Sequence, residues 1–470
     1  MSDVTIKRTA PGPKPARNLL EQLRLMSQFD HDTLGMIQRG FDTFGDVWLI
    51  EAGKMQQFMF RHPDHYHEIL ITKASSFHKD LNYKDRKKGL GRFMGNGLVT
   101  SDGDFWKRQR KLIQPAFHAR RIEAYAQAMV HITLGQIQDW RDDTVIEVSE
   151  QMMEATLKVV TRSVFDVDIT QATHTIGAAM TTFQNMSNNQ NQMIPAWVPT
   201  PLELKTRQAL HEMDDIVYSL IRERRVSAHD RGDLLSMLLE ARDDDGSGMT
   251  DEQIRDELVT LFLAGHETTA NSLNWTWYLL AQHPEVEAKL HAELDSVLAG
   301  RTPTLQDLKQ LPYTEMVIKE SMRLCPAVYA IGRQAIEDVE IGSYRIPKGA
   351  SIGIFSFVTH RDPRWWGDDV GQFNPERFAP DQEAQIKKYA YLPFSTGPRI
   401  CIGNSFAMME AHLMLATIAQ RWRLELQPGQ VVEPEPLITL RPKGGLHMIA
   451  KSRTPQAVAK ATPQAEPLPL

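Results

Sequence analysis

A glycine-containing loop around a cysteine near the end of the chain is the feature that most constrains the fold. The loop spans residues 394–403, and Cys401 is one of only two cysteines in 470 residues. Its two glycines flank the thiol and let the backbone approach a large, flat group. Arg399 places a cation two residues before the thiol, and helix-forming residues follow from Ser405. A helix N-terminus and a nearby cation both lower the pKa of a thiol. The pattern therefore favours a thiolate ligand for iron over the usual alternative, a buried structural cysteine.

The composition excludes several classes of protein. Hydrophobic residues make up 42% of the chain and charged residues 24%, which is typical of a globular protein. The net charge of −6 argues against nucleic acid as a partner. Two cysteines cannot form a disulfide framework, so we expect a reducing, cytoplasmic compartment. Residues 1–30 contain no run of about twenty apolar residues, so we expect neither a signal peptide nor a membrane anchor.

A long helix opens at Thr250, where Gln253 completes a capping box. Apolar residues lie on both of its sides, which predicts a buried helix. Within it the sequence reads Ala-Gly-His-Glu-Thr-Thr over residues 264–269. A buried carboxyl and hydroxyl are costly unless they are used, and Glu267 with Thr268 could relay protons. The alternative, a threonine that bonds to a carbonyl one turn earlier, remains open.

Two pairs of residues at helical spacing give weaker evidence of a functional role. Trp106 and Arg110 lie four residues apart on one helix face, and an indole N–H beside a guanidinium suits a carboxylate. A core tryptophan with a surface arginine is the alternative. Glu320 and Arg323 also share a helix face, where surface pairs contribute little stability.

The rest of the chain predicts helices with a few short strands. Strands are expected at residues 47–50 and 57–60, then near 333–339, 343–346 and 349–358. Residues 122–225 are mostly helical but are interrupted by the polar run Ser187–Gln192, whose apolar neighbours form either core or a lid over an apolar cavity. A helix from about Thr314 stops before Pro326. An irregular segment at 360–381 and a helix from 405 to about 422 follow.

Three other patterns are set aside. Gly95-Asn96-Gly97 lacks the third glycine of a dinucleotide fingerprint. The acids at 243, 245 and 252 match only part of a calcium loop, because Ala241 would stand at the first ligand position. The basic stretch from Lys84 to Arg92 is interpreted as a solvated loop.

Taken together, the motifs resemble the cytochrome P450 family, over about residues 19–451. The Ala-Gly-His-Glu-Thr-Thr string is that of the bacterial fatty-acid-hydroxylase branch. The resemblance implies a mainly α fold with small β-sheets, a helical prism around a buried haem b. It implies a single haem domain over 1–452 and a flexible tail over 453–470, with Cys401 as the axial iron ligand.

The resemblance also implies roles for other residues. Thr268 and Glu267 would serve oxygen activation, through a hydrogen bond and through protons supplied by water, and Ala264 and Gly265 would leave room for oxygen. The expected haem contacts are Trp106, Arg110, Arg399, Phe394, Gly397, Gly403, Arg333 and Lys79. Glu320, Arg323 and Arg377 would form a charged cluster behind the cysteine loop. The expected substrate pocket is apolar and comprises Val99, Phe262, Ala327, Val328, Ala330, Leu437 and Ile438.

The implied activity is a monooxygenase that uses O2 and two electrons to hydroxylate or epoxidise a lipophilic fatty acid, terpenoid or macrocycle. A haem-thiolate enzyme that does not use O2, such as a peroxide-driven enzyme, isomerase or dehydratase, and a non-catalytic haem sensor are the alternatives. Because no reductase follows before Leu470, we expect a separate ferredoxin or flavodoxin with its reductase. It would dock on a basic face formed by Lys107, Arg108, Lys111, Arg120 and Arg121. Cys325 is expected to be an ordinary packing residue.

Overall fold

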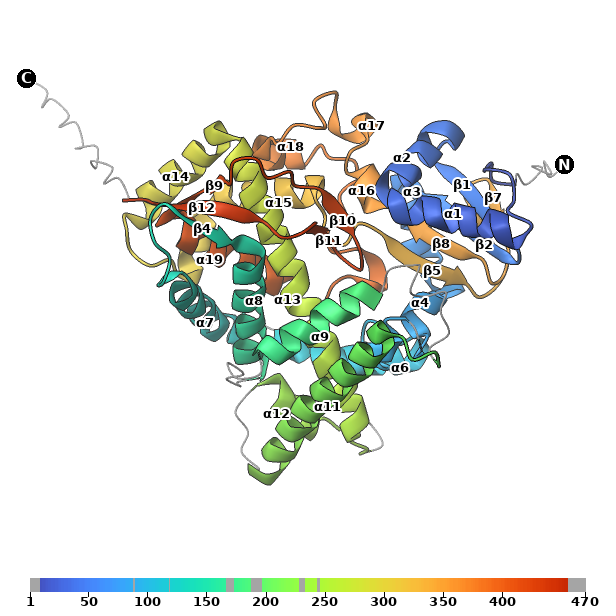
Figure 1. Ribbon diagram of the computed structural model, residues 1–470, viewed down its shortest axis with the longest axis horizontal. Helices are drawn as coiled ribbons and strands as arrows, with labels where there is room; N and C mark the ends of the chain where they lie inside the picture. Colours follow the sequence, from blue (N-terminus) through green and yellow to red (C-terminus); the bar gives the residue numbers. More distant parts are fainter. Residues whose placement is uncertain are drawn as a thin grey trace, which may run out of the picture.

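The computed structural model describes residues 9–87, 89–117, 119–165, 173–186, 197–227, 233–242 and 246–454. Helices form most of it, with two main sheets set apart from each other (Figure 1). This is the mainly α fold with small sheets that the sequence predicts. The Ser187–Gln192 run, residues 243 and 245 of the rejected calcium loop, and all of the tail beyond 454 lie outside the described residues.

Helix α13 (Asp251–Gln282) runs through the centre of the molecule (Figure 1). The predicted capping box is present: Thr250 Oγ1 accepts from Gln253 N–H at 3.2 Å, and the Gln253 side chain accepts from Thr250 N–H at 2.9 Å. Around α13 pack α8 (Val148–Phe165), α11 (Pro201–Ser227), α15 (Pro312–Leu324) and α19 (Asn404–Ala419). Polar side chains on α13 must therefore find their partners inside the protein.

One sheet joins strands from the N-terminal part of the chain to strands between residues 331 and 354. Its strand order is β1 (Val47–Ala52), β2 (Met55–Phe60), β8 (Ser351–Ile354), β5 (Ile331–Ala335) and β3 (Phe77–His78). The predicted β1–β2 hairpin is confirmed, while β2 and β8 pair in parallel. The strand predicted at 349–358 is too long, because the chain turns into helix α16 (Ser356–Thr359). The strand predicted at 333–339 is really the end of β5 and the start of β6 (Val339–Ile341), which pairs with β7 (Tyr344–Ile346).

The second main sheet contains a strand that the sequence does not predict. β4 (Thr144–Glu147) pairs with β12 (His447–Ser452), which pairs with β9 (Trp422–Leu426). β4 lies between α7 (Ala119–Ile137) and α8, so the surrounding helical pattern hides it. α19 ends at Ala419, earlier than predicted, because Trp422 opens β9. A small hairpin of β10 (Pro434–Pro436) and β11 (Leu440–Pro442) encloses residues 437–439.

The remaining helices cover these elements. Among the described residues no helix is both long and apolar enough to cross a membrane. They include α1 (Leu19–His31), α2 (Thr33–Phe44), α4 (Leu81–Lys84), α5 (Gly91–Met94), α6 (Gly103–Ile113), α9 (Thr173–Met186) and α14 (Pro284–Leu298).

The glycines of the 95–97 segment serve a contact with α13. A side chain at Gly97 would lie 2.1 Å from Thr260 Oγ1, so only glycine fits there. The neighbouring N–H groups are held by carboxylates of α13: Asn96 donates to Asp256 at 2.7 Å and Leu98 to Glu257 at 2.9 Å. The close contact fixes the segment that leads to residue 99.

Candidate active site

The cysteine loop is closed by its own backbone. Cys401 N–H donates to Phe394 O at 3.0 Å, and both Ser395 and Gly397 have positive φ values of 60° and 73°. A side chain at Gly397 would lie 2.1 Å from Leu70 O. Glycine is therefore required at 397 both by its backbone conformation and by the close approach of Leu70.

The thiol lies where opposing effects act on its pKa. Burial raises the pKa of Cys401 above its ordinary value, while a hydrogen bond from Gly403 N–H and the charge of Arg110 lower it. Gly403 is the N-cap of α19, so this hydrogen bond comes from a helix N-terminus. The residue is exposed, although burial is the largest effect on the pKa of its thiol. A bound metal cation would provide the further stabilisation that the thiolate needs.

Three cations converge near the loop, and we call Lys79, Arg333 and Arg399 the cation cluster. They come from three separate segments, and Arg333 is close enough to lower the pKa of both Lys79 and Arg399. Burial, followed by Arg333 and Arg399, holds the pKa of Lys79 well below its ordinary value. Burial also lowers the pKa of Arg399 to about 10. Positive charge gathered in a buried place predicts an anionic ligand.

The hydrogen-bond partners of Arg399 do not neutralise the positive charge of the cation cluster. Its Nη2 donates to Asp102 Oδ1 at 2.5 Å and to Ser101 O at 2.8 Å. Its Nη1 is buried and has no hydrogen-bond partner among the described residues. Asp102 is shared, because Lys84 Nζ also lies 2.5 Å from it. Two carboxylates, Asp102 and Asp80, act on the three cations of the cluster, and Asp102 is shared with Lys84, so positive charge remains in excess. These residues therefore fit the propionates of haem.

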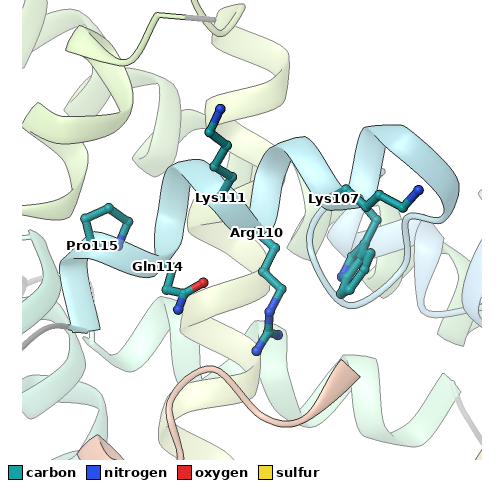
Figure 2. Close-up of a pocket in the computed structure, with 6 residues that line it drawn as sticks. Lys107, Arg110, Lys111, Gln114 and Pro115 are labelled. Atoms are coloured by element: carbon teal, nitrogen blue, oxygen red, sulfur yellow. The ribbon is translucent and has the colours of Figure 1, made fainter. Parts of the chain in front are cut away.

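Trp106 and Arg110 of α6 lie next to Arg399 and the cysteine loop. The Arg399 guanidinium lies 4.3 Å from the centre of the Trp106 ring, and that of Arg110 lies 5.8 Å from it. Arg110 Nη1 donates to Ile400 O at 2.9 Å, which joins α6 to the cysteine loop. Figure 2 shows Arg110 and Lys111 pointing to opposite sides of α6. A pocket of about 310 Å³ opens here, lined by Trp106, Lys107, Arg110, Lys111, Gln114 and Pro115.

On α13 the two predicted catalytic side chains have different surroundings. Thr268 Oγ1 donates to Ala264 O at 2.8 Å, so the backbone bond of a helical threonine is present. Glu267 is buried, and its Oε1 accepts from Thr439 Oγ1 at 2.5 Å and from Gln184 Nε2. Burial raises the pKa of Glu267 to about 7. A carboxyl with this pKa can give and take protons near neutral pH.

Three neighbours of this site were not predicted. Gln184, Thr439 and Glu410 are single polar residues in apolar surroundings, so no local pattern marks them. Glu410 of α19 is fully buried beside Thr269, and burial holds its pKa well above the ordinary value. Gly265 also differs from expectation: its missing side chain faces α8, where a Cβ would lie 3.0 Å from Val160. The space it leaves therefore serves helix packing.

The segments expected to line the substrate pocket lie together. Leu440 N–H donates to Ala327 O at 2.9 Å, and the Tyr329 hydroxyl donates to Leu437 O at 2.9 Å. Thr439 of the same turn contacts Glu267, so this turn lies beside α13. Phe262 differs from the prediction, because its side chain is fully buried in the core. Ala327 is nearly buried, and the partly exposed members are Val99, Val328, Ala330, Leu437 and Ile438.

The predicted charged cluster is also brought together. Glu320 and Arg323 of α15 form a fully buried ion pair, with an N–O distance of 2.6 Å. Arg377 Nε lies 3.5 Å from Glu320, and its Nη2 lies 2.6 Å from Asp369. Arg323 Nη1 donates to His360 O, and His360 Nε2 accepts from Leu392 N–H at 2.9 Å. Two hydrogen bonds therefore connect Arg323 to the segment that enters the cysteine loop.

Comparison with known proteins places this geometry in a family. The family model "Cytochrome P450" matches residues 11–449. Cyclooctatin synthase of Streptomyces melanosporofaciens is 35% identical over 87% of this chain and 89% of its own. Pentalenene oxygenase of Streptomyces avermitilis is 34% identical, covering 87% and 91%. Cyclooctat-9-en-7-ol 5-monooxygenase of S. melanosporofaciens is 36% identical, covering 82% and 84%.

The family match spans the cysteine loop, α13 and the buried ion pair of α15 alike. Its members bind haem through a cysteine thiolate, which agrees with the position of Cys401 and with the charge of the cation cluster. The chain belongs to the cytochrome P450 family and is a haem-thiolate monooxygenase.

Proposed function

We propose that this monooxygenase hydroxylates or epoxidises a cyclic terpenoid. The observation that carries the proposal is the small, aliphatic character of the residues expected to line the substrate pocket: Val99, Ala327, Val328, Ala330, Leu437 and Ile438. Small aliphatic side chains suit a bulky hydrocarbon skeleton, which makes no polar contacts. Relatives that cover most of the chain are named for oxygenation of terpenoids, which supports the same class.

The residues of the chain divide the work. Haem bound to Cys401 would supply the redox chemistry that activates oxygen. The cation cluster and Trp106 would hold its carboxylates. Glu267 would keep a proton near neutral pH, and Thr268 would pass it on by turning its hydroxyl away from Ala264 O. The apolar side chains would orient the substrate and exclude water, which protects the reaction from side products.

The test is a ligand screen with the haem-loaded protein. Cyclic terpene hydrocarbons and terpene alcohols, saturated fatty acids and a macrolide are titrated while the haem absorbance is recorded. We expect the terpenes to displace the water-bound spectrum and to give an oxygenated product with O2 and an electron donor. A response confined to fatty acids or macrolides would overturn the substrate class. Product formed with peroxide but never with O2 and donor would favour the peroxide-driven alternative.

For electron supply we propose a separate acidic protein of the ferredoxin or flavodoxin type. Lys107 and Lys111 are exposed on α6 and line one pocket with Trp106 and Arg110, which would contact haem, and Arg108 is partly exposed on the same helix. Clustered basic residues at the shortest route to the cofactor favour steering of an acidic partner. The side chains of Arg120 and Arg121, also expected there, lie outside the described residues.

A further inference from the structure

The carboxamide of Gln184 on α9 meets the carboxyl of Glu267 on α13. Both side chains are buried, with exposed fractions of 2% and 3%. The same amide also contacts the turn between β10 and β11, where its Oε1 accepts from Ile438 N–H at 3.3 Å. One buried amide therefore joins three segments that are far apart in the sequence.

The direction of each hydrogen bond follows from the partners. A backbone N–H can only donate, so the oxygen of Gln184 faces Ile438 and its NH2 group faces Glu267. Asn271 Nδ2 donates to Thr439 Oγ1 at 3.0 Å, and the Thr439 proton is directed to Glu267. Oε1 of Glu267 thus accepts two hydrogen bonds, one from α9 and one from the turn.

We infer that Gln184 is a positioning residue that holds the Glu267 carboxyl against α9 and the β10–β11 turn. The inference rests on the proposed role of Glu267 as the proton source. Thr268 lies one position along α13, about 100° around the helix, and its hydroxyl is committed to Ala264 O. For Glu267 to serve Thr268, its carboxyl must leave Gln184. Proton supply is therefore coupled to how α9 is docked.

Helix α9 also packs against segments that carry residues expected to line the substrate pocket. Phe183, the residue before Gln184, packs on Phe93 of α5 with ring centres 4.7 Å apart. α5 leads into the segment that carries Val99, and Ile438 belongs to the turn that Gln184 contacts. A substrate held between Val99 and Ile438 would touch both attachments of α9. Gln184 can then transmit its presence to Glu267.

The charges around Glu267 allow a clean readout. Arg441 of β11 is the charged group that acts on its pKa, in the lowering direction. On the helices packed around α13, Glu154 pairs with Lys158 on α8 and Glu320 with Arg323 on α15, and burial keeps Glu410 of α19 and His266 of α13 itself neutral. The donors on Gln184 and Thr439 stabilise the ionised carboxyl. Loss of either donor should raise the pKa of Glu267.

The test uses Gln184→Leu with two matched controls on α9. Phe183→Leu loosens the packing of α9 but keeps the amide, and Thr182→Val removes an outward hydroxyl that bonds only within the helix turn, to Ala178 O. Infrared difference spectra of the haem-loaded proteins follow the carboxylic acid band of Glu267, which is identified by its loss in Glu267→Gln. We expect Gln184→Leu to raise the titration midpoint by about one pH unit. Phe183→Leu and Thr182→Val should leave it unchanged.

Product formed per electron donated, measured against pH, should follow the same shift. A wild-type midpoint in Gln184→Leu, or an equal shift in Phe183→Leu, overturns the inference. If Gln184→Leu does not fold, Gln184→Asn shortens the amide and Thr439→Val removes the other donor, and both should give the upward shift. Unchanged coupling in Glu267→Gln would overturn the proposed role of Glu267, while the infrared midpoint would still decide whether Gln184 holds the carboxyl.

Discussion

Arg323 donates two hydrogen bonds to Glu320, from Nε at 2.6 Å and from Nη2 at 2.7 Å, and neither side chain is exposed. Its other bonds go to the carbonyls of His360 and Gln372, and Asn374 N–H donates to the same carboxylate. The pair therefore ties α15 to the irregular segment before the cysteine loop. Removing one partner of such a buried ion pair destabilises the fold, because the other charge then remains unpaired in the core.

Replacing Arg323 by alanine should prevent haem incorporation. The buried Glu320 carboxylate would lose its closest cation and keep only Arg377 at 3.5 Å, which would cost about 3–5 kcal/mol of folding free energy. We expect purified Arg323→Ala to lack haem, measured as the ratio of haem to protein. Arg345→Ala, which breaks an exposed pair with Asp338, is the matched control and should retain full haem. A fully loaded Arg323→Ala protein would contradict the structural role.

The two cysteines should behave differently. Cys401→Ser should abolish the thiolate-type absorbance of the reduced carbon monoxide complex, because we propose the Cys401 thiolate as the iron ligand. Cys325 caps the end of α15 and packs against the core, so Cys325→Ser should keep that spectrum. Loss of the spectrum in Cys325→Ser alone would show that the ligand had been assigned to the wrong residue.

Thr268→Ala should uncouple the enzyme. Donor would still be consumed, but product per electron should fall by about tenfold or more, with peroxide released instead. Thr276 makes the same backbone bond two turns later, at 2.7 Å to Ser272 O, so Thr276→Ala controls for the loss of a helical hydroxyl. Product and peroxide are measured in parallel with donor oxidation. Equal coupling in the two variants would refute a role for Thr268.

Because Glu257 is buried, the free energy of unfolding should decrease as pH rises. Burial raises its pKa to about 8 in the folded protein, from an ordinary value of 4.5. Between these values the unfolded chain has lost the proton that the folded protein keeps, so the free energy of unfolding decreases with pH. Glu257→Gln keeps an oxygen for Leu98 N–H and removes this dependence. Urea titrations from pH 5 to 8 should show a flatter profile than for the exposed control Glu252→Gln, whose profile should match the wild type.

Reversing charge on α6 should slow electron transfer. Lys107→Glu and Lys111→Glu should lower the second-order rate of reduction by an acidic ferredoxin, and the loss should shrink as salt rises. Lys205→Glu changes the same charge on exposed α11 and should have little effect. A wild-type rate that does not depend on salt would argue against steering by this face.

Local patterns carried much of the prediction. The cysteine loop, the capping box at Thr250 and the β1–β2 hairpin depend on residues close in sequence, and each is confirmed in the structure. The pairing of Glu320 with Arg323 was visible as a spacing, but its burial was not. Only the fold brings His360 and Asn374 to this pair and removes it from water.

Long-range pairing explains what the sequence did not predict. β4 exists because β12 passes beside it. Residues 356–358, at the end of the strand predicted over 349–358, form part of α16 instead. The roles of Gln184 and Thr439 become evident only in the folded structure, where both side chains contact Glu267. The excess charge of the cation cluster likewise depends on three segments whose distances no spacing reveals.

The parallel pairing of β2 with β8 has a consequence for synthesis on the ribosome. Gln57 lies opposite Ser351, so the sheet that contains the N-terminal hairpin cannot close until most of the chain has emerged. Until then β2 presents an open edge, and edges of this kind are prone to pair with other chains. The nascent protein would therefore depend on chaperones, or on slow translation, for longer than a protein whose first strands pair locally.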